Sequence, residues 1–134
     1  MANTTSVADY QVLLDQNVTL DTAFGQPEDP EITLNFSVPS DLINSGFSRQ
    51  PVLAFKARPF EDSSFTIFMN HREIFSTSLD ASHTRIFWEV FSFQTAFPDG
   101  ASFSNPTPVR FLLNSGRLRI ADMVLWYQVD RPWE

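Results

Sequence analysis

Hydrophobic and polar residues alternate along most of this chain. The clearest run is residues 31–38, where four apolar side chains occupy every second position: Ile32, Leu34, Phe36 and Val38. Side chains two residues apart project from the same face of a strand, so this period predicts a half-buried β-strand. A helical period of three to four residues is almost absent. The pattern therefore predicts an all-β protein.

Similar apolar runs, bounded by turn residues, predict seven further strands. They cover residues 18–24, 52–57, 65–69, 73–77, 86–93, 109–113 and 117–129. The segment 70–72 separates two of these runs closely enough to predict a hairpin turn. About eight short strands in 134 residues are typical of an antiparallel β-sandwich, and we expect the jelly-roll version.

The last apolar run changes its phase in the middle. Leu118 and Ile120 share one parity, whereas Met123 and Leu125 share the other. One extra residue at Ala121-Asp122 would keep both pairs on the same face of a strand. The sequence therefore predicts a β-bulge at this point.

A few segments depart from the strand pattern. Ser40, Asp41 and Gly46 carry the capping signals of one short helical turn near residues 40–46. Residues 1–8 are expected to form a flexible N-terminal tail, and residues 130–134 a C-terminal tail. A chain of 134 residues has the usual size of one domain, so we expect a single domain, 1–134.

The second half of the chain has a distinctive succession of segments. An apolar strand, 52–57, precedes the hairpin Phe65-Thr66-Ile67-Phe68-Met69-Asn70-His71-Arg72-Glu73-Ile74, and a strand containing Trp88 follows. The chain then closes with Ile120-Ala121-Asp122-Met123-Val124-Leu125-Trp126-Tyr127. Over about residues 50–129 this succession resembles galactose-binding-like jelly-roll domains of the carbohydrate-binding-module type. His71 departs from their pattern, in which the hairpin turn usually has glycine.

The resemblance implies a jelly-roll sandwich that binds carbohydrate or a cell-surface ligand, in some members with a structural calcium ion. It does not imply catalysis. Glu28, Asp29 and Glu31 lie close together in sequence and offer the hard oxygen ligands that calcium prefers. Asp122 would be the matching ligand if the resemblance extends to the metal. A charged loop without metal is the alternative that we favour, so we expect no cofactor.

Composition and charge limit the kinds of partner that this chain is expected to bind. The chain has 16 acidic and 9 basic residues, a net charge of -7 and a single lysine, Lys56, which argues against binding nucleic acid. No apolar run reaches the roughly 20 residues of a membrane-spanning helix, so we expect no membrane insertion. The chain has no cysteine, which excludes a disulfide framework and thiolate catalysis.

Catalytic signals are weak. The two histidines, His71 and His83, lie on predicted turns, and the sequence has no nucleophile-elbow motif. Glu73 and Glu89 lie on predicted strands and would be the candidate pair for glycoside cleavage, but a surface or salt-bridged Glu89 is the simpler interpretation. We therefore expect that the protein is not an enzyme.

The first functional hypothesis is a non-catalytic binding module for glycans or a cell-surface ligand. Five polar residues on two predicted loops are the candidate ligand-binding residues: Asn70, His71, Arg72, His83 and Arg85. They would form one rim if both loops lie at the same end of the sandwich, and they offer the directional donors and acceptors that hydroxyl-rich ligands need. Trp88, Trp126 and Tyr127 have apolar neighbours in sequence, so we expect them in the core.

The alternative is a self-assembling structural subunit, such as a component of a virion, phage tail or fibre. Arginine outnumbers lysine eight to one, and arginine is favoured at protein interfaces. The candidate subunit contacts are three phenylalanines in predicted loops and a tryptophan in the polar C-terminal tail: Phe60, Phe97, Phe103 and Trp133. The partners of such a subunit would be copies of itself or other proteins.

The sequence carries few signals that indicate where the protein is located. The N-terminus lacks the basic start and apolar core of a classical signal peptide, which leaves a cytoplasmic, particle-associated or non-classically exported protein as expectations. Three Asn-x-Ser/Thr sequons begin at Asn3, Asn17 and Asn35, and such triplets arise by chance in a Thr-rich sequence of this kind.

Overall fold

In the computed structural model, residues 4–22, 29–40, 42–43, 51–80, 88–94 and 106–132 are described, and they form ten strands. The strands are β1 (Thr4–Leu14), β2 (Val18–Asp21), β3 (Glu31–Phe36), β4 (Leu42–Ile43), β5 (Val52–Pro59), β6 (Ser63–Met69), β7 (Arg72–Leu79), β8 (Glu89–Gln94), β9 (Thr107–Ser115) and β10 (Arg117–Pro132). These parts of the chain contain no helix long and apolar enough to cross a membrane.

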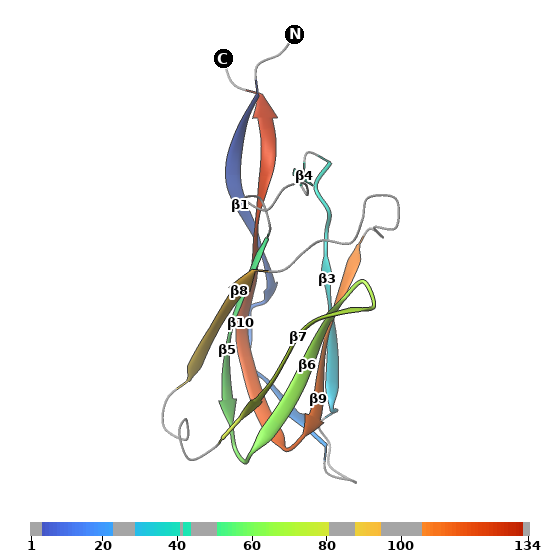
Figure 1. The fold of residues 1–134 in the computed structure, drawn as a ribbon, viewed down its shortest axis with the longest axis vertical. Coiled ribbons are helices and arrows are strands. Elements are labelled where there is room, and N and C mark those ends of the chain that lie inside the picture. The colour runs from blue at the N-terminus through green and yellow to red at the C-terminus, as the bar shows by residue number, and fades with distance from the viewer. Residues whose placement is uncertain are drawn as a thin grey trace.

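The strands form two antiparallel sheets that pack face to face (Figure 1). The six-stranded sheet has the order β1-β10-β5-β8, with β2 and β4 also paired to β10, and the four-stranded sheet has the order β3-β9-β6-β7. Without the short strands β2 and β4, the remaining eight follow the orders 1-8-3-6 and 2-7-4-5, which is a jelly roll. The predicted all-β sandwich of jelly-roll type is therefore confirmed.

The longest strand, β10, organises the six-stranded sheet. Along one edge its residues 117–120 pair with β2 and residues 123–132 pair with β1. Along the other edge its residues 118–126 pair with β5, and residues 128–129 pair with β4. Four strands are thus ordered by one strand, and the first and last strands of the chain lie side by side (Figure 1).

The bulge predicted in this strand is present. The pairing of β10 with β5 shifts between Ala121 and Val124, and Asp122 has the positive φ of 53°. Four residues before and after the bulge are completely buried although their parity changes: Leu118, Ile120, Met123 and Leu125. The extra residue therefore keeps one side of β10 facing the core along its length.

Phenylalanine rings from both sheets meet in the core. Phe65 and Phe111 of the four-stranded sheet stack with their centroids 4.6 Å apart, and Phe55 of the six-stranded sheet meets Phe111 edge-on at 5.6 Å. Phe75 of β7 stacks on Phe93 of β8 at 4.3 Å, between the last strands of the two sheets. Each buried ring contributes about 1.5–3 kcal/mol, so this cluster holds the two sheets together.

Three local predictions were wrong. Leu42 and Ile43, expected in a helical turn near 40–46, form strand β4 and pair with Val129 and Gln128. Residues 4–8, expected in a flexible N-terminal tail, and residues 130–132, expected in a C-terminal tail, are paired strand, with Thr4 opposite Pro132. Isolated capping residues and a polar composition do not prevent strand pairing when a long partner strand, here β10, offers an unpaired edge.

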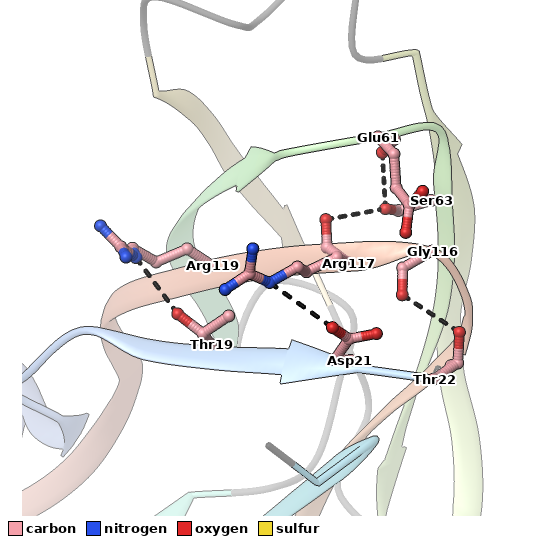
Figure 2. A network of polar contacts seen from close by, with 8 residues as sticks. All are labelled: Thr19, Asp21, Thr22, Glu61, Ser63, Gly116, Arg117 and Arg119. Atoms are coloured by element: carbon pink, nitrogen blue, oxygen red, sulfur yellow. Dashed lines mark hydrogen bonds and ion pairs between the residues drawn. The ribbon is translucent and has the colours of Figure 1, made fainter. Parts of the chain in front are cut away.

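A tight corner joins the two sheets at Gly116, between β9 and β10 (Figure 2). The carbonyl of Gly116 accepts hydrogen bonds from the backbone N–H and the hydroxyl of Thr22, at 3.2 and 3.1 Å. The Ser63 hydroxyl lies 2.8 Å from the Glu61 carbonyl and 3.2 Å from the Arg117 carbonyl, both of which can accept its proton. These contacts fix the position where the chain passes from one sheet to the other.

The geometry of this corner predicts that adding a side chain at Gly116 destabilises the protein. Gly116 has φ +91°, and a Cβ at this position would lie closer than 3.0 Å to the Asp62 carbonyl and to Ser63. We expect Gly116→Ala to lower the free energy of unfolding by at least about 1–2 kcal/mol, measured by urea denaturation. Ser92→Ala, on an exposed position of β8, is the control and should change it by less than about 0.5 kcal/mol. Equal stability of the two variants would contradict this account of the corner.

The positive φ of Asp122 leads to a second testable prediction, which compares the stability of two substitutions at this residue. The Asp122 carboxylate lies 2.9 Å from the Lys56 ammonium, and Asp122→Gly and Asp122→Val both remove this pair. Only valine adds a branched Cβ at a positive φ, which is sterically costly. We therefore expect Asp122→Val to be less stable than Asp122→Gly by about 1–2 kcal/mol in thermal or urea unfolding. A valine variant as stable as the glycine variant would show that the bulge is not held in this conformation.

Candidate functional site

The outer face of the six-stranded sheet carries the most unusual surface of the described residues. On β5 the side chains that alternate with the buried ones project outward: Val52, Ala54, Lys56 and Arg58. On β10, Arg117 and Arg119 project outward before the bulge, and Val124, Trp126 and Gln128 do so after it. Because the four-stranded sheet covers only the opposite side, the described strands leave this face open to solvent.

Two large aromatic side chains lie next to each other on this face. Tyr10 of β1 is directly opposite Trp126 of β10, and their ring centroids are 4.9 Å apart with a tilt of 41°. Tyr10 is 53% exposed and Trp126 is 45% exposed. Most large aromatic side chains bury their area, so an exposed pair marks a surface that can bind a ligand or a partner.

The aromatic pair belongs to a row that crosses four strands. In register order the row is Tyr10, Trp126, Val52 and Gln94, and we call it the aromatic row. The next row consists of smaller side chains: Val12, Val124, Ala54 and Ser92. The face therefore combines exposed rings, small neighbours and an amide, which is suited to a flat ligand with both apolar and hydrogen-bonding groups.

Trp126 was expected in the core, and that prediction was wrong, whereas Tyr127 is buried as expected. The two residues differ in parity along β10. Trp126 lies between the buried residues Leu125 and Tyr127, so its side chain projects from the opposite face of the strand. Tyr10 was missed because it borders the segment expected to be a tail. Nothing in the local sequence shows that β1 pairs with the end of β10 and brings Tyr10 to Trp126.

The predicted loop residues Asn70, His71 and Arg72 do lie together, in the hairpin turn between β6 and β7. Met69 pairs with Arg72, and the two turn residues have positive φ values of 50° for Asn70 and 68° for His71, as a type I′ turn requires. The hairpin prediction is therefore confirmed. His71 lines a small cavity of about 160 Å³ together with Thr33, Phe68, Pro108 and Arg110.

The other two predicted rim residues, His83 and Arg85, lie outside the described residues. The described residues on either side of them are at the opposite end of the sheets from the hairpin turn. Leu79 pairs with Ser63, and Glu89 pairs with Ala57, both far along their strands from Asn70. The described structure therefore gives no support to a single rim made from both loops.

Among the predicted subunit contacts, Phe60 is described and is 40% exposed. Phe97, Phe103 and Trp133 lie outside the described residues. The other phenylalanines that the structure describes are buried or half-buried, many of them in the aromatic core. The large number of phenylalanines is thus used mainly for packing in the described part of the chain.

The acidic residues considered for calcium or catalysis are dispersed. Asp122 lies beside Lys56, and Glu31 pairs with the guanidinium of Arg110 at 2.5 Å on the other sheet. Within the described ranges, no group of three or more acidic or histidine side chains is placed to hold a metal ion, and Glu28 lies outside them. Glu73 and Glu89 belong to different sheets.

A larger open cavity, of about 370 Å³, lies near the corner end of the four-stranded sheet. Its lining is mostly hydroxyl and carboxylate: Asp62, Ser63, Ser64, Ser78, Leu79, Asp80 and Ser115. Ser64 and Ser115 share a hydrogen bond of 2.8 Å across this lining. The described lining of this cavity includes no aromatic side chain and so lacks the flat apolar surface of the aromatic row.

Comparison with solved structures supports the fold. Dimeric latent PorU from Porphyromonas gingivalis is similar to this chain with a TM-score of 0.58 and 12% identity, over 96% of this chain and 13% of the PorU chain. A xylan-binding module, CBM15, is similar with a TM-score of 0.48 and 8% identity, over 92% of this chain and 97% of that one. A glycoside hydrolase family 43 arabinoxylan arabinofuranohydrolase from Bacillus subtilis has a TM-score of 0.43 and 10% identity, over 92% of this chain and 27% of that one.

The likeness to PorU, with a TM-score of 0.58, shows that this fold also occurs in a known protein. At these identities the likeness concerns the fold alone. No model of a known protein family matches the sequence. A search of curated proteins also gives no match.

The hairpin turn predicts a stabilising substitution. His71 adopts a left-handed conformation that costs a non-glycine residue about 1 kcal/mol, and asparagine followed by glycine is the preferred sequence for this turn. We expect His71→Gly to raise the free energy of unfolding by about 0.5–1 kcal/mol in urea denaturation. Glu73→Gly, just after the turn in strand β7, is the control and should be destabilising. A less stable His71→Gly variant would mean that the imidazole makes a contact worth more than the backbone cost.

Proposed function

We propose that this chain is a non-catalytic binding module that recognises glycans through the aromatic row of its six-stranded sheet. The observation that carries the proposal is the exposed pair of rings, Tyr10 and Trp126, with centroids 4.9 Å apart. Their polar atoms lie at the edge of an apolar ring surface, which matches a sugar ring with its apolar C–H face and hydroxyl rim.

The neighbours of the two rings favour a flat, extended ligand. Val52 and Ala54 are small, and they lie between the aromatic residues and the polar side chains of β8. Gln94 at the end of the row supplies amide donors and acceptors for hydroxyl groups. A polysaccharide lying across the strands would contact apolar and polar groups in the same row.

The same row supports binding without catalysis. Glycoside cleavage requires two carboxyl groups on either side of the bond. Tyr10, Trp126, Val52 and Gln94 include no carboxylate, and the nearest described charged groups on β5 and β10, Lys56 and Asp122, are paired to each other. A ligand held at the aromatic row would therefore be bound and not cleaved.

The test of this proposal is Trp126→Ala. Losing one stacked ring should weaken glycan binding by at least roughly tenfold, which corresponds to about 1.4 kcal/mol. Affinity electrophoresis against a panel of soluble polysaccharides identifies a ligand, and isothermal titration with its oligosaccharides gives the Kd. Val90→Ala is the matched control, since Val90 is 68% exposed on the same sheet but outside the aromatic row.

Two results would count against the proposal. If Trp126→Ala binds every ligand of the panel as tightly as the unmodified chain does, the aromatic row is not the binding site. If Val90→Ala weakens binding equally, the effect is not specific to the row. Near-UV circular dichroism of both variants checks that the fold is retained.

A self-assembling structural subunit is the second candidate, and one observation favours it. Val12 and Val124 extend the apolar surface beside Tyr10 and Trp126, so a second protein surface could cover this face. The predicted contacts in such an assembly remain Phe60, Phe97, Phe103 and Trp133. Light scattering over a concentration series would distinguish the candidates, because an oligomer that dissociates with Trp126→Ala would favour assembly over glycan binding.

A further inference from the structure

Three arginines surround one exposed aromatic ring on the same sheet. The guanidinium carbons of Arg117, Arg119 and Arg58 lie 4.9, 5.1 and 6.0 Å from the centroid of the Phe60 ring. Phe60 itself is 40% exposed, so its ring is accessible beside these groups. We call these four residues the arginine cluster.

The arginine cluster concentrates positive charge at one end of the outer face. Arg58 and Arg119 are direct partners across β5 and β10, and like charges directly opposite each other repel. Arg117 projects from the same face two residues along β10. Cation–π contacts with Phe60 and the Asp21 carboxylate beside Arg117 offset part of this repulsion. Three guanidinium groups around one exposed ring make this end of the face attractive to an anion.

Contacts from β2 hold two of these guanidinium groups in place (Figure 2). The Nε of Arg117 lies 3.5 Å from a carboxylate oxygen of the buried Asp21, and the Nε of Arg119 donates a hydrogen bond of 3.3 Å to the Thr19 hydroxyl. Both contacts are made by Nε. The two terminal nitrogens of Arg119 carry four further N–H donors, and these suit a bidentate contact with a planar carboxylate.

The arginine cluster and the aromatic row lie on the same outer face of the six-stranded sheet, at two separate positions along β5 and β10. Arg58 and Val52 both project outward from β5 and are six residues apart, which is about 20 Å at the rise of a strand. Arg58 pairs with Arg119, whereas Val52 pairs with Trp126. The bulge at Asp122 is what places Arg119 and Trp126 on the same side of β10 despite their opposite parity.

The cluster also contrasts with the charge of the whole chain. The chain has a net charge of -7, yet four of its nine basic residues project from this face of β5 and β10: Lys56, Arg58, Arg117 and Arg119. A generally acidic protein repels polyanions over most of its surface, so a local group of arginines orients an acidic ligand toward this face.

We infer that the ligand class of this face is an acidic glycan that contains uronate residues. The arginine cluster would bind its carboxylates, with Phe60 beneath a sugar ring, while the aromatic row would bind another part of the same chain. This inference rests on the proposed glycan-binding function and specifies its ligand. A continuous face with rings at one end and guanidinium groups at the other fits an extended polymer better than a small anion.

The test compares ligands that differ only in their charge. Oligosaccharides of homogalacturonan, alginate and glucuronoxylan are titrated beside the same oligosaccharides with methyl-esterified carboxyl groups. We expect at least one acid form to bind at least tenfold more tightly than its ester at low salt, and the difference to shrink as salt is raised. In the double variant Arg58→Gln/Arg119→Gln, the acid and the ester should bind with similar affinity.

Arg110→Gln is the matched control. Arg110 lies on the four-stranded sheet, where it pairs with Glu31 and stacks on Phe68, so its loss should leave the preference for the acid form unchanged. Urea denaturation of the double variant checks folding. The binding result is interpreted only if this variant unfolds cooperatively and remains folded under the conditions of the titration.

The outcomes separate the two proposals. If acid and ester forms bind equally and Trp126→Ala still weakens both, the uronate inference is wrong and the glycan-binding function stands. If Trp126→Ala leaves all binding unchanged, the proposed function itself is wrong. If sulfated oligosaccharides or an RNA oligonucleotide bind through the arginine cluster and no uronate does, the assignment of the ligand class is overturned.

Discussion

One extra residue in the last strand determines the organisation of this protein. The bulge at Asp122 lets β10 keep its apolar side toward the core over its whole length, although the parity of its buried residues changes at this point. A regular strand would turn either Leu118 and Ile120 or Met123 and Leu125 to solvent, which would lose several kcal/mol of apolar burial. Because β1, β2, β4 and β5 all pair with β10, their positions depend on the same residue.

The bulge has an equal effect on the outer face. Arg119 and Trp126 would point to opposite sides of a regular strand, and the bulge puts them on one side. The aromatic row and the arginine cluster are thereby parts of one surface. The aromatic core, in which Phe55 meets Phe65 and Phe111, supports this surface from behind with closely packed rings from both sheets. A rigid sheet face holds separated binding groups in fixed positions and so lowers the entropic cost of binding.

The fold places two exposed aromatic residues, Tyr10 and Trp126, on the sheet face and not among the polar loop residues that the sequence suggested as the binding site. Polar loop residues such as Asn70, His71 and Arg72 occur in turns for conformational reasons, since a tight hairpin turn requires polar residues that tolerate positive φ. A tryptophan directly opposite a tyrosine stabilises a sheet by only about 0.2–1 kcal/mol, and here both rings leave about half of their surface in solvent. The stronger evidence for binding is therefore the feature that folding alone does not explain.

The sequence by itself determined the features that depend on near neighbours in the chain. Alternation located eight of the ten described strands, all except β1 and β4, a change of parity located the bulge at Asp122, and the short polar segment after Met69 located the hairpin. Only the tertiary structure decided which outward residues are neighbours. Strand 117–129 is apolar on both parities, so Trp126 looked buried, but the second sheet covers one side of β10 only. The pairing of β1 with β10 and of β5 with β10 joins Tyr10 to Trp126 and Arg58 to Arg119, and strand pairing between distant segments leaves no local pattern in the sequence.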